Sequence, residues 1–204
     1  MRSKRSSASH RRLTGLVRRP RRAPPSNVWE LHLPSPFHTD RVGRAIGAAL
    51  QGGETLALYG PLGAGKTALV RGIAAGLGAP STAVSSPTFV LIHEYRGRLP
   101  LAHIDLYRLN SMREIESIGL GEYFSGSTVV AIEWADKGHA ILPPDRLEIE
   151  LRHHTVQSRS IRLTATGPVS AALLASTRRS HARPSKFPLS LRLPLPKRKG
   201  KASS

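Results

Sequence analysis

The chain has 204 residues and no cysteine, a length that suits one domain of ordinary size and a composition that excludes disulfide bonds, thiolate nucleophiles and cysteine-ligated metals. No run approaches 18 consecutive apolar residues, so we expect no membrane span and a cytoplasmic protein. The formal charge of +18 is uneven, because residues 1–27 and 166–204 each hold 9 Lys or Arg and no acid, whereas residues 28–165 hold 13 of each sign.

The two basic ends also differ from the neutral middle in composition. They are rich in Ser, Pro and Arg, and cannot bury enough apolar surface to offset the entropy of ordering. We therefore predict one folded domain at 28–165 and disordered basic arms at 1–27 and 166–204. Three interpretations of the arms are open. They are extensions without function, which for residues 1–27 could result from an upstream start codon, or they attract RNA through its phosphates. The third is that residues 1–27 contain an organelle transit peptide.

The first half of the domain alternates between strands and helices. Residues 28–33 have the alternation of a strand, and Thr39 and Asp40 offer N-cap oxygens for a helix after it. Residues 55–59 form a short apolar run, which is typical of a strand buried on both faces of a parallel sheet. Apolar residues then recur at helical spacing over residues 66–77.

The second half adds a hairpin, a short helix and three strands. Strand-like residues 89–95 and 99–106 flank a turn, and Ser111 with Glu114 fits a capping box. The remaining strand-like segments are residues 128–132, 146–151 and 160–163. This order predicts an α/β fold, a single P-loop NTPase-like domain whose mixed central sheet is flanked by helices.

A glycine-rich loop lies between the second strand and the second helix. Its residues match G-x-x-x-x-G-K-[ST] and are Gly60, Pro61, Leu62, Gly63, Ala64, Gly65, Lys66 and Thr67. In such a loop the backbone N–H groups surround phosphate oxygens at a helix N-terminus. Lys66 would reach the β- and γ-phosphates of a nucleotide, and the Thr67 hydroxyl would bind Mg²⁺.

Two acids stand where hydrolysis needs them. Asp105 ends the strand before the short helix, and Glu133 ends a later buried strand. Because the carboxyl ends of parallel strands share one edge of the sheet with the phosphate loop, both acids can face Mg²⁺ or orient water. We predict catalytic roles for Lys66, Asp105 and Glu133, and metal contacts from Thr67, Asp105 and Glu133.

Neighbouring side chains have two interpretations each. Trp134 is either a core residue or a flat surface for adenine. Strand alternation places His103 and Tyr107 on the same face as Asp105. His103 is either a core histidine or a functional one, and Arg108 either pairs with a surface acid or acts in the site.

Four motifs in succession carry a more specific resemblance. The glycine loop, Ser86-Pro-Thr-Phe89, His103-Ile-Asp-Leu-Tyr-Arg108 and Glu133-Trp134 closely resemble those of the TsaE (YjeE) family of small bacterial ATPases over residues 28–165. The resemblance implies a Mg²⁺-dependent ATPase that is weak by itself and that serves the threonylcarbamoyladenosine modification of tRNA. Its implied partners are TsaD and TsaB, which it would reset between turnovers, while TsaC supplies threonylcarbamoyl-adenylate.

The resemblance also implies roles for single residues. Lys66 and Thr67 become phosphate and magnesium contacts, and Thr88 becomes a switch-like residue near the γ-phosphate. Asp105 and Glu133 become metal-side or water-orienting acids. Trp134 becomes a neighbour of the nucleotide. The basic arms lie outside the compact pattern of the family, so the resemblance says nothing about them. Weak tRNA contact through the arms is suggested by their composition alone.

Three other functions fit parts of the sequence. A P-loop kinase of a small metabolite would use the same loop, but residues 28–165 hold no arginine-rich lid. A GTP-binding switch protein would need an Asn-Lys-x-Asp guanine motif, which is missing from the sequence. An RNA-binding module with a vestigial loop fits poorly with the neutral domain.

Overall fold

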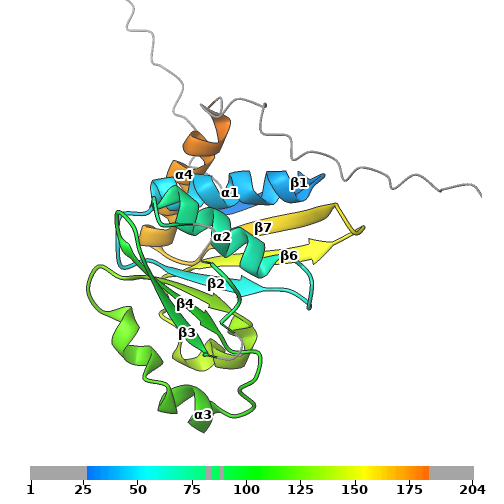
Figure 1. The fold of residues 1–204 in the computed structure, drawn as a ribbon. Helices are drawn as coiled ribbons and strands as arrows, with labels where there is room; N and C mark the ends of the chain where they lie inside the picture. Colours follow the sequence, from blue (N-terminus) through cyan, green and yellow to red (C-terminus); the bar gives the residue numbers. More distant parts are fainter. Residues whose placement is uncertain (1–26, 81–83, 88–89, 184–204) are drawn as a thin grey trace, which may run out of the picture.

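A computed structural model describes residues 27–80, 84–87 and 90–183. Seven strands form one sheet in the order β1-β7-β6-β2-β5-β4-β3, with helices on both faces (Figure 1). The strands are β1 (Val28–Leu33), β2 (Thr55–Tyr59), β3 (Ile92–Arg96), β4 (Pro100–Asp105), β5 (Val129–Glu133), β6 (Leu147–His153) and β7 (Arg159–Ala165). The helices are α1 (Pro36–Ala49), α2 (Lys66–Gly76), α3 (Met112–Ser117), η2 (Leu120–Phe124), η3 (Ala135–Ile141) and α4 (Pro168–Ala182).

The sheet is mixed, which confirms the predicted fold class. The central strands β6, β2, β5 and β4 run parallel to one another, and β1, β7 and β3 pair antiparallel with their neighbours. Every residue of β5 is buried, as expected of an apolar strand covered on both faces. The parallel register aligns Asp105 with Glu133, and Glu133 with Leu58 of β2, so both acids and the end of β2 share one edge of the sheet.

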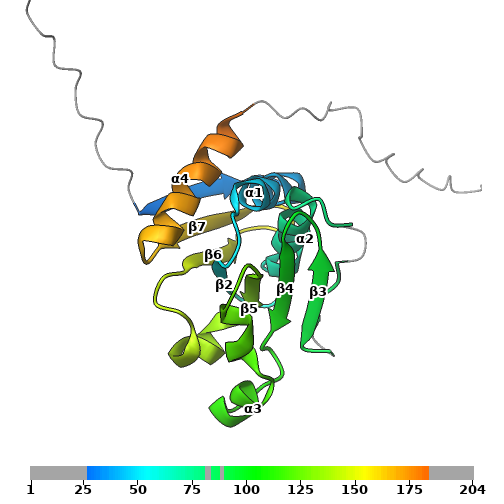
Figure 2. The ribbon, with the colours of Figure 1, turned by 90° about the vertical axis from the view of Figure 1, so that its left-hand side faces the viewer.

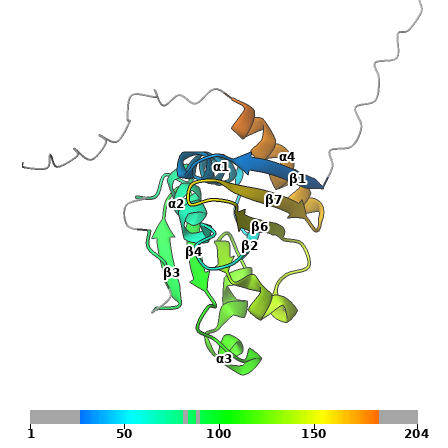
Figure 3. The same ribbon diagram turned by 90° about the vertical axis from the view of Figure 1, so that its right-hand side faces the viewer.

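Helices form a layer on each face of the sheet. One core lies between the sheet and the layer of α1, α2 and α4, and the other lies beneath α3, η2 and η3 (Figures 2 and 3). Successive residues of β5 alternate between them, since Val129 and Ala131 belong to the first core while Val130 and Ile132 belong to the second. The side chain of Glu133, in phase with Ala131, therefore lies on the face that α2 covers.

Helices α1 and α2 pack with almost no space between their backbones. A Cβ atom at Gly47 of α1 would lie 2.2 Å from the Ile73 carbonyl oxygen, and one at Gly43 would lie 2.5 Å from the Leu69 carbonyl oxygen. A Cβ atom at Gly72 of α2 would lie 2.7 Å from the Asp40 carbonyl oxygen of α1. This contact fixes α2, whose first residue is Lys66, against the rest of the domain.

Helix α1 begins one turn earlier than the sequence suggested. Its N-cap is Ser35 and its first residue is Pro36, so the prediction of Thr39 or Asp40 as the cap was wrong. Proline suits a first helical position because that residue has no intrahelical N–H partner to lose. Thr39 is instead fully buried, and its hydroxyl accepts a hydrogen bond from Arg159.

Residues 168–182 form helix α4, which corrects the prediction that a disordered arm begins at residue 166. Leu173 and Leu174 are buried in the larger of the two cores, which is the one between the sheet and the layer of α1, α2 and α4. The carboxylate of Asp145 accepts hydrogen bonds from the backbone N–H groups of Val169 and Ser170 at 2.8 and 2.9 Å, which satisfies the start of the helix. The rest of the predicted arms, residues 1–26 and 184–204, lies outside the described residues.

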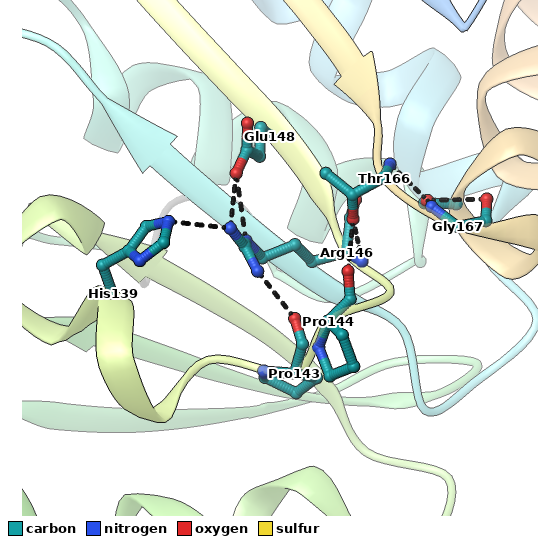
Figure 4. A network of polar contacts seen from close by, with 8 residues as sticks. His139, Pro143, Pro144, Arg146, Glu148, Thr166 and Gly167 are labelled. Carbon is teal, nitrogen blue, oxygen red and sulfur yellow. Dashed lines mark hydrogen bonds and ion pairs between the residues drawn. The ribbon is translucent and has the colours of Figure 1, made fainter.

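A polar network next to Asp145 holds the start of α4 against the sheet (Figure 4). The Ser170 hydroxyl accepts from the backbone N–H groups of Thr166 and Gly167. The Thr166 hydroxyl contacts the backbone of Arg146, whose guanidinium donates to Glu148 at 2.7 Å and lies within 3.1 Å of His139 of η3. Because Arg146 is buried, these partners compensate for its desolvation.

Other local predictions agree with the structure. Strands β3 and β4 form the predicted hairpin, and the Ser111 hydroxyl accepts from the Glu114 N–H at 3.2 Å at the start of α3. Among the described residues, no helix is long and apolar enough to cross a membrane.

Candidate functional site

A cleft of about 370 Å³ opens at the sheet edge where β2, β4 and β5 end. Its lining residues are Leu62, Gly63, Gly65, Lys66, Thr67, Ser86, Asp105, Tyr107, Glu133 and Trp134. Eight of these ten are residues that the sequence predicted for the site. The loop between β2 and α2 and the first residues of α2 supply one side of the cleft, and the ends of β4 and β5 supply the other.

The glycines of the loop adopt backbone angles that other residues disfavour. Gly60 has a φ of 135°, and a Cβ atom there would lie 2.3 Å from the Leu151 carbonyl oxygen. Gly63 and Gly65 have φ angles of 78° and 101°. Such angles let the chain curl around an anion at the start of α2. Ala64 is buried in the core, so it shapes the loop without lining the cleft.

The Lys66 ammonium lies beneath the loop, and the residue is only 4% exposed. Its Nζ donates to the carbonyl oxygens of Gly60 and Pro61 at 2.7 and 3.2 Å and lies 3.8 Å from the centre of the Trp134 ring. Burial lowers the pKa of Lys66, although the nearby carboxylates, with Glu133 foremost, act in the opposite direction. A desolvated cation of this kind is a strong partner for a phosphate group.

Glu133 and Asp105 are both buried at the inner wall of the cleft. Oε1 of Glu133 accepts a hydrogen bond from the Thr67 hydroxyl at 2.8 Å and lies 2.8 Å from Nε2 of His103. Asp105 accepts from the Ser86 hydroxyl at 2.8 Å and from the Tyr107 N–H at 3.0 Å. Thr67 and His103 thus contact Glu133, whereas Ser86 and Tyr107 contact Asp105.

Trp134 adopts a left-handed backbone conformation with a φ of 56°, which is unusual for a residue with a bulky side chain. Its ring centre is 4.9 Å from that of Tyr107, and its face lies over the Lys66 ammonium. This placement beside the phosphate-binding lysine favours contact with the phosphate end of a nucleotide, whereas the sequence suggested stacking on adenine. Strain of this kind often occurs at functional sites.

Several predicted residues lie elsewhere. Gly60 and Pro61 contribute carbonyl oxygens to Lys66 rather than surface to the cleft. Arg108 is exposed and does not line the cleft. Thr88 lies outside the described residues, so its switch-like role stays a prediction.

Arg159 is a buried charge close to the loop that the sequence analysis did not single out. It is 6% exposed, its Nη1 donates to the Thr39 hydroxyl at 3.2 Å, and it lies 3.3 Å from where a Cβ atom of Gly65 would be. The sequence does hold one sign that Arg159 is buried, namely its position in the strand alternation. Arg159 stands at the start of the alternation Arg159, Ile161, Leu163, whose other members face the core.

The donor set of the cleft fits Mg²⁺. The Thr67 hydroxyl and the Glu133 carboxylate are hard oxygen donors that already contact each other, and Asp105 is aligned with Glu133 in register. Within the described parts of the chain, no group of three or more His, Cys, Asp or Glu side chains could hold a metal ion alone. Mg²⁺ commonly binds through one or two carboxylates together with substrate phosphates, so this is the expected arrangement for a magnesium–nucleotide complex.

The family model and the sequence relatives that match this chain agree on one family. Residues 33–161 match the family model described as "Threonylcarbamoyl adenosine biosynthesis protein TsaE". The chain is 42% identical over 134 residues to a tRNA threonylcarbamoyladenosine biosynthesis protein TsaE of Bacillus subtilis, covering 65% of this chain and 83% of that protein. It is 42% identical over 114 residues to the TsaE of Treponema pallidum, covering 56% of this chain and 84% of that protein.

A solved structure agrees with the sequence relatives. The crystal structure of Bacillus subtilis YdiB matches with a TM-score of 0.63 and 34% identity over 74% of this chain and 95% of that chain. The family match ends at residue 161, before helix α4 begins. From the fold, the loop and cleft geometry and these matches together, the chain belongs to the TsaE family of threonylcarbamoyladenosine biosynthesis proteins.

Proposed function

We propose that this protein hydrolyses ATP to ADP and phosphate in the presence of Mg²⁺, and that it does so for the threonylcarbamoyladenosine modification of tRNA. One observation supports this most: Lys66 and Thr67 of the phosphate loop share one cleft with the buried carboxylates of Asp105 and Glu133. A phosphate loop alone binds nucleotide, whereas hydrolysis also needs acids on the metal side and near the attacking water.

Each residue has a distinct role in the proposal. Lys66 would exchange its contacts with the loop carbonyls for β- and γ-phosphate oxygens and would stabilise the charge that develops during transfer. Thr67 and Glu133 would hold Mg²⁺, which when bound neutralises phosphate charge, and Asp105 would contribute on the same side. Glu133 and Asp105 are also the two acids that could orient the attacking water, and substitution of each in turn decides between them.

Trp134 and Thr88 complete the proposed nucleotide site. The Trp134 ring would cover the phosphate end of the nucleotide beside Lys66, to which it lies close. Thr88 would sense the γ-phosphate, a role that rests on the family resemblance alone.

The proposed partners are TsaD and TsaB, and the proposed location is the cytoplasm. Repeated turnover of the TsaD–TsaB pair would depend on ATP hydrolysis by this protein. The curated relatives carry names that place them in the same tRNA modification, which supports the pathway but names no partner.

Weak tRNA contact through the basic segments is a further part of the proposal. Arg178 of α4 donates to the carbonyl oxygen of Val28 at 2.5 Å, and His181 packs edge-on against Trp29. The C-terminal half of α4 therefore contacts the start of β1. Residues 166–183 add Arg178, Arg179 and Arg183 there and no acid, which is a suitable charge for phosphate groups.

The alternative function is a kinase of a small metabolite, which would use the same loop and acids. Thin-layer analysis of labelled ATP, incubated with the protein with and without candidate acceptors, separates the two. The proposed ATPase releases inorganic phosphate whichever acceptor is present. Label that moves to an acceptor instead would support the kinase, and competition by unlabelled GTP as strong as by ATP would contradict the choice of nucleotide.

A further inference from the structure

His103 is a polar residue in a position that otherwise suits an apolar one. It lies in the middle of β4, between Ala131 of β5 and His93 of β3 in the register of the sheet, and it is fully buried. Leu101, two residues earlier on the same face, belongs to the larger core. A histidine here therefore needs a reason beyond packing.

The hydrogen bond that the structure describes for His103 points to that reason. Nε2 lies 2.8 Å from Oε1 of Glu133, and none of the described residues offers Nδ1 a hydrogen-bond partner. A carboxylate oxygen can only accept, so Nε2 is the protonated nitrogen and donates to Glu133. A histidine kept for stability would satisfy both nitrogens, because an unpaired buried polar atom costs about 1–3 kcal/mol.

Glu133 is held from two directions. Its Oε1 accepts from Thr67 at the start of α2 and from His103 on β4. Thr67 lines the cleft, whereas His103 does not. We propose that the Thr67 hydroxyl turns toward Mg²⁺ when the metal binds. The hydrogen bond from His103 would then still hold the Glu133 carboxylate.

We propose that His103 is a positioning residue for Glu133: its Nε2–H fixes the carboxylate in the orientation needed for hydrolysis. His103 is not among the described residues that line the cleft, so its loss should lower kcat and leave nucleotide affinity intact. Partners of this kind are worth about 10- to 100-fold in activity when they orient a metal-binding side chain. The role rests on the proposed ATPase function.

Three substitutions at His103 separate positioning from packing. Gln extends its amide nitrogen to about where Nε2 stands, Asn extends it only to about where Nδ1 stands, and Leu fills the space without a donor. We expect His103→Leu and His103→Asn to lower kcat about 10- to 100-fold, with KM and nucleotide affinity within about threefold of the parent. We expect His103→Gln to stay within about fivefold of the parent in kcat.

His93→Leu is the matched control. His93 pairs with His103 in the register of the sheet but contacts Tyr95 instead of Glu133, so we expect the kcat of this variant to match the parent.

These kinetics overturn the inference under two outcomes. Equal losses in the Gln and Leu variants, with lowered thermal stability in both, would mean that His103 only packs. A Leu variant with the kcat of the parent would mean that Glu133 needs no help from it.

A measurement without catalysis separates failure of this inference from failure of the proposed function. Nuclear magnetic resonance of the full chain labelled with nitrogen-15 in histidine reports which ring nitrogen of His103 carries the proton. We expect an Nε2–H resonance that shifts in Glu133→Gln and stays in place in Glu150→Gln, since Glu150 lies on β6 away from the cleft. That result would support the contact even if the protein hydrolysed no ATP, whereas a proton on Nδ1 would overturn the inference.

Discussion

Lys66 supplies a buried cation to the proposed phosphate site. We predict that Lys66→Ala abolishes ATP hydrolysis, because the substitution removes the buried ammonium that would neutralise the β- and γ-phosphates, a loss on the order of several kcal/mol in the transition state. Steady-state phosphate release by the parent and the variant measures it. Arg113→Ala is the control, since Arg113 is an exposed cation on α3. A variant within a few-fold of the parent would contradict the role of the loop.

Glu133 and Asp105 differ in their partners and should differ in their effects. We predict that Glu133→Gln keeps ATP binding and slows hydrolysis by about 10²- to 10⁴-fold, because the amide preserves the shape and loses the charge that orients water or supports the metal. Nucleotide titration and single-turnover hydrolysis measure the two effects separately. If hydrolysis survives in Glu133→Gln and is lost in Asp105→Asn, the water-orienting role belongs to Asp105.

The residues that the sequence predicted well are those whose evidence is local. Gly60 to Thr67 carry a contiguous motif, and the two acids stand at strand ends. The contact of His103 with Glu133 and the approach of Arg159 to Gly65 were not predictable, since each joins segments that only the folded sheet brings together. For His103 and Arg159 the sequence shows a polar side chain at a position where the strand pattern expects an apolar one. It does not show which distant residue that side chain contacts.

Helix α4 depends on an acid from outside itself. The carboxyl of Asp145 is desolvated, which opposes its ionisation, but hydrogen bonds from the Ser170 backbone and side chain and from the Val169 backbone outweigh this and place its pKa below the ordinary value of 3.8. A depressed pKa of this kind means that the ionised carboxylate stabilises the folded state at neutral pH. That stability is lost as the pH falls through the folded-state pKa.

We therefore predict that Asp145→Ala lowers the free energy of unfolding by about 1–2 kcal/mol at pH 7, because two backbone donors at the start of α4 lose a charged acceptor. The difference between parent and variant should shrink as the pH falls from about 5 to below the pKa of Asp145. Urea unfolding across this range measures it, with Asp40→Ala as a control for a solvent-accessible ion pair with Arg44. A difference that is equal at pH 7 and in strong acid would show that the charge is irrelevant.

At the level of elements, the sequence predicted the strands and the hairpin better than the helix ends. The strands of residues 28–165 have an apolar pattern of their own, which locates them along the chain. Helix α4 was missed because composition averaged over residues 166–204 hides Leu173 and Leu174, whose burial needs the core that α1 and the sheet provide. The start of α1 was misplaced because Thr39 is also a residue type that caps helices; Pro36 at the first helical position favours Ser35 instead, and Thr39 is buried with its hydroxyl bonded to Arg159.

The molecule as a whole is a nearly neutral domain with strongly basic ends. Residues 27–183 have a formal charge of +3, against +18 for the chain. We predict that a chain trimmed to residues 27–183 keeps its ATPase rate and loses most of its non-specific tRNA binding. In the full chain this binding should fall steeply with salt, because each phosphate contact releases counterions.

Retention of tRNA at low and moderate salt, measured beside the ATPase rate for both chains, tests this division. Equal tRNA binding by the two would remove the RNA role of the basic ends. A loss of ATPase activity on trimming would place part of the functional site outside residues 27–183. Trimming further to residue 165 should destabilise the domain, since it uncovers the core beneath Leu173 and Leu174.

Repeated turnover of the TsaD–TsaB pair in the presence of this protein is the most direct test of the proposed function. The measurement counts the tRNA molecules modified per TsaD–TsaB pair when threonylcarbamoyl-adenylate and ATP are in excess, with the parent chain, with Lys66→Ala or with neither. We predict many modifications per pair with the parent, and about one without it or with the variant. Equal numbers in all three reactions would contradict the proposal that ATP hydrolysis by this protein resets its partners.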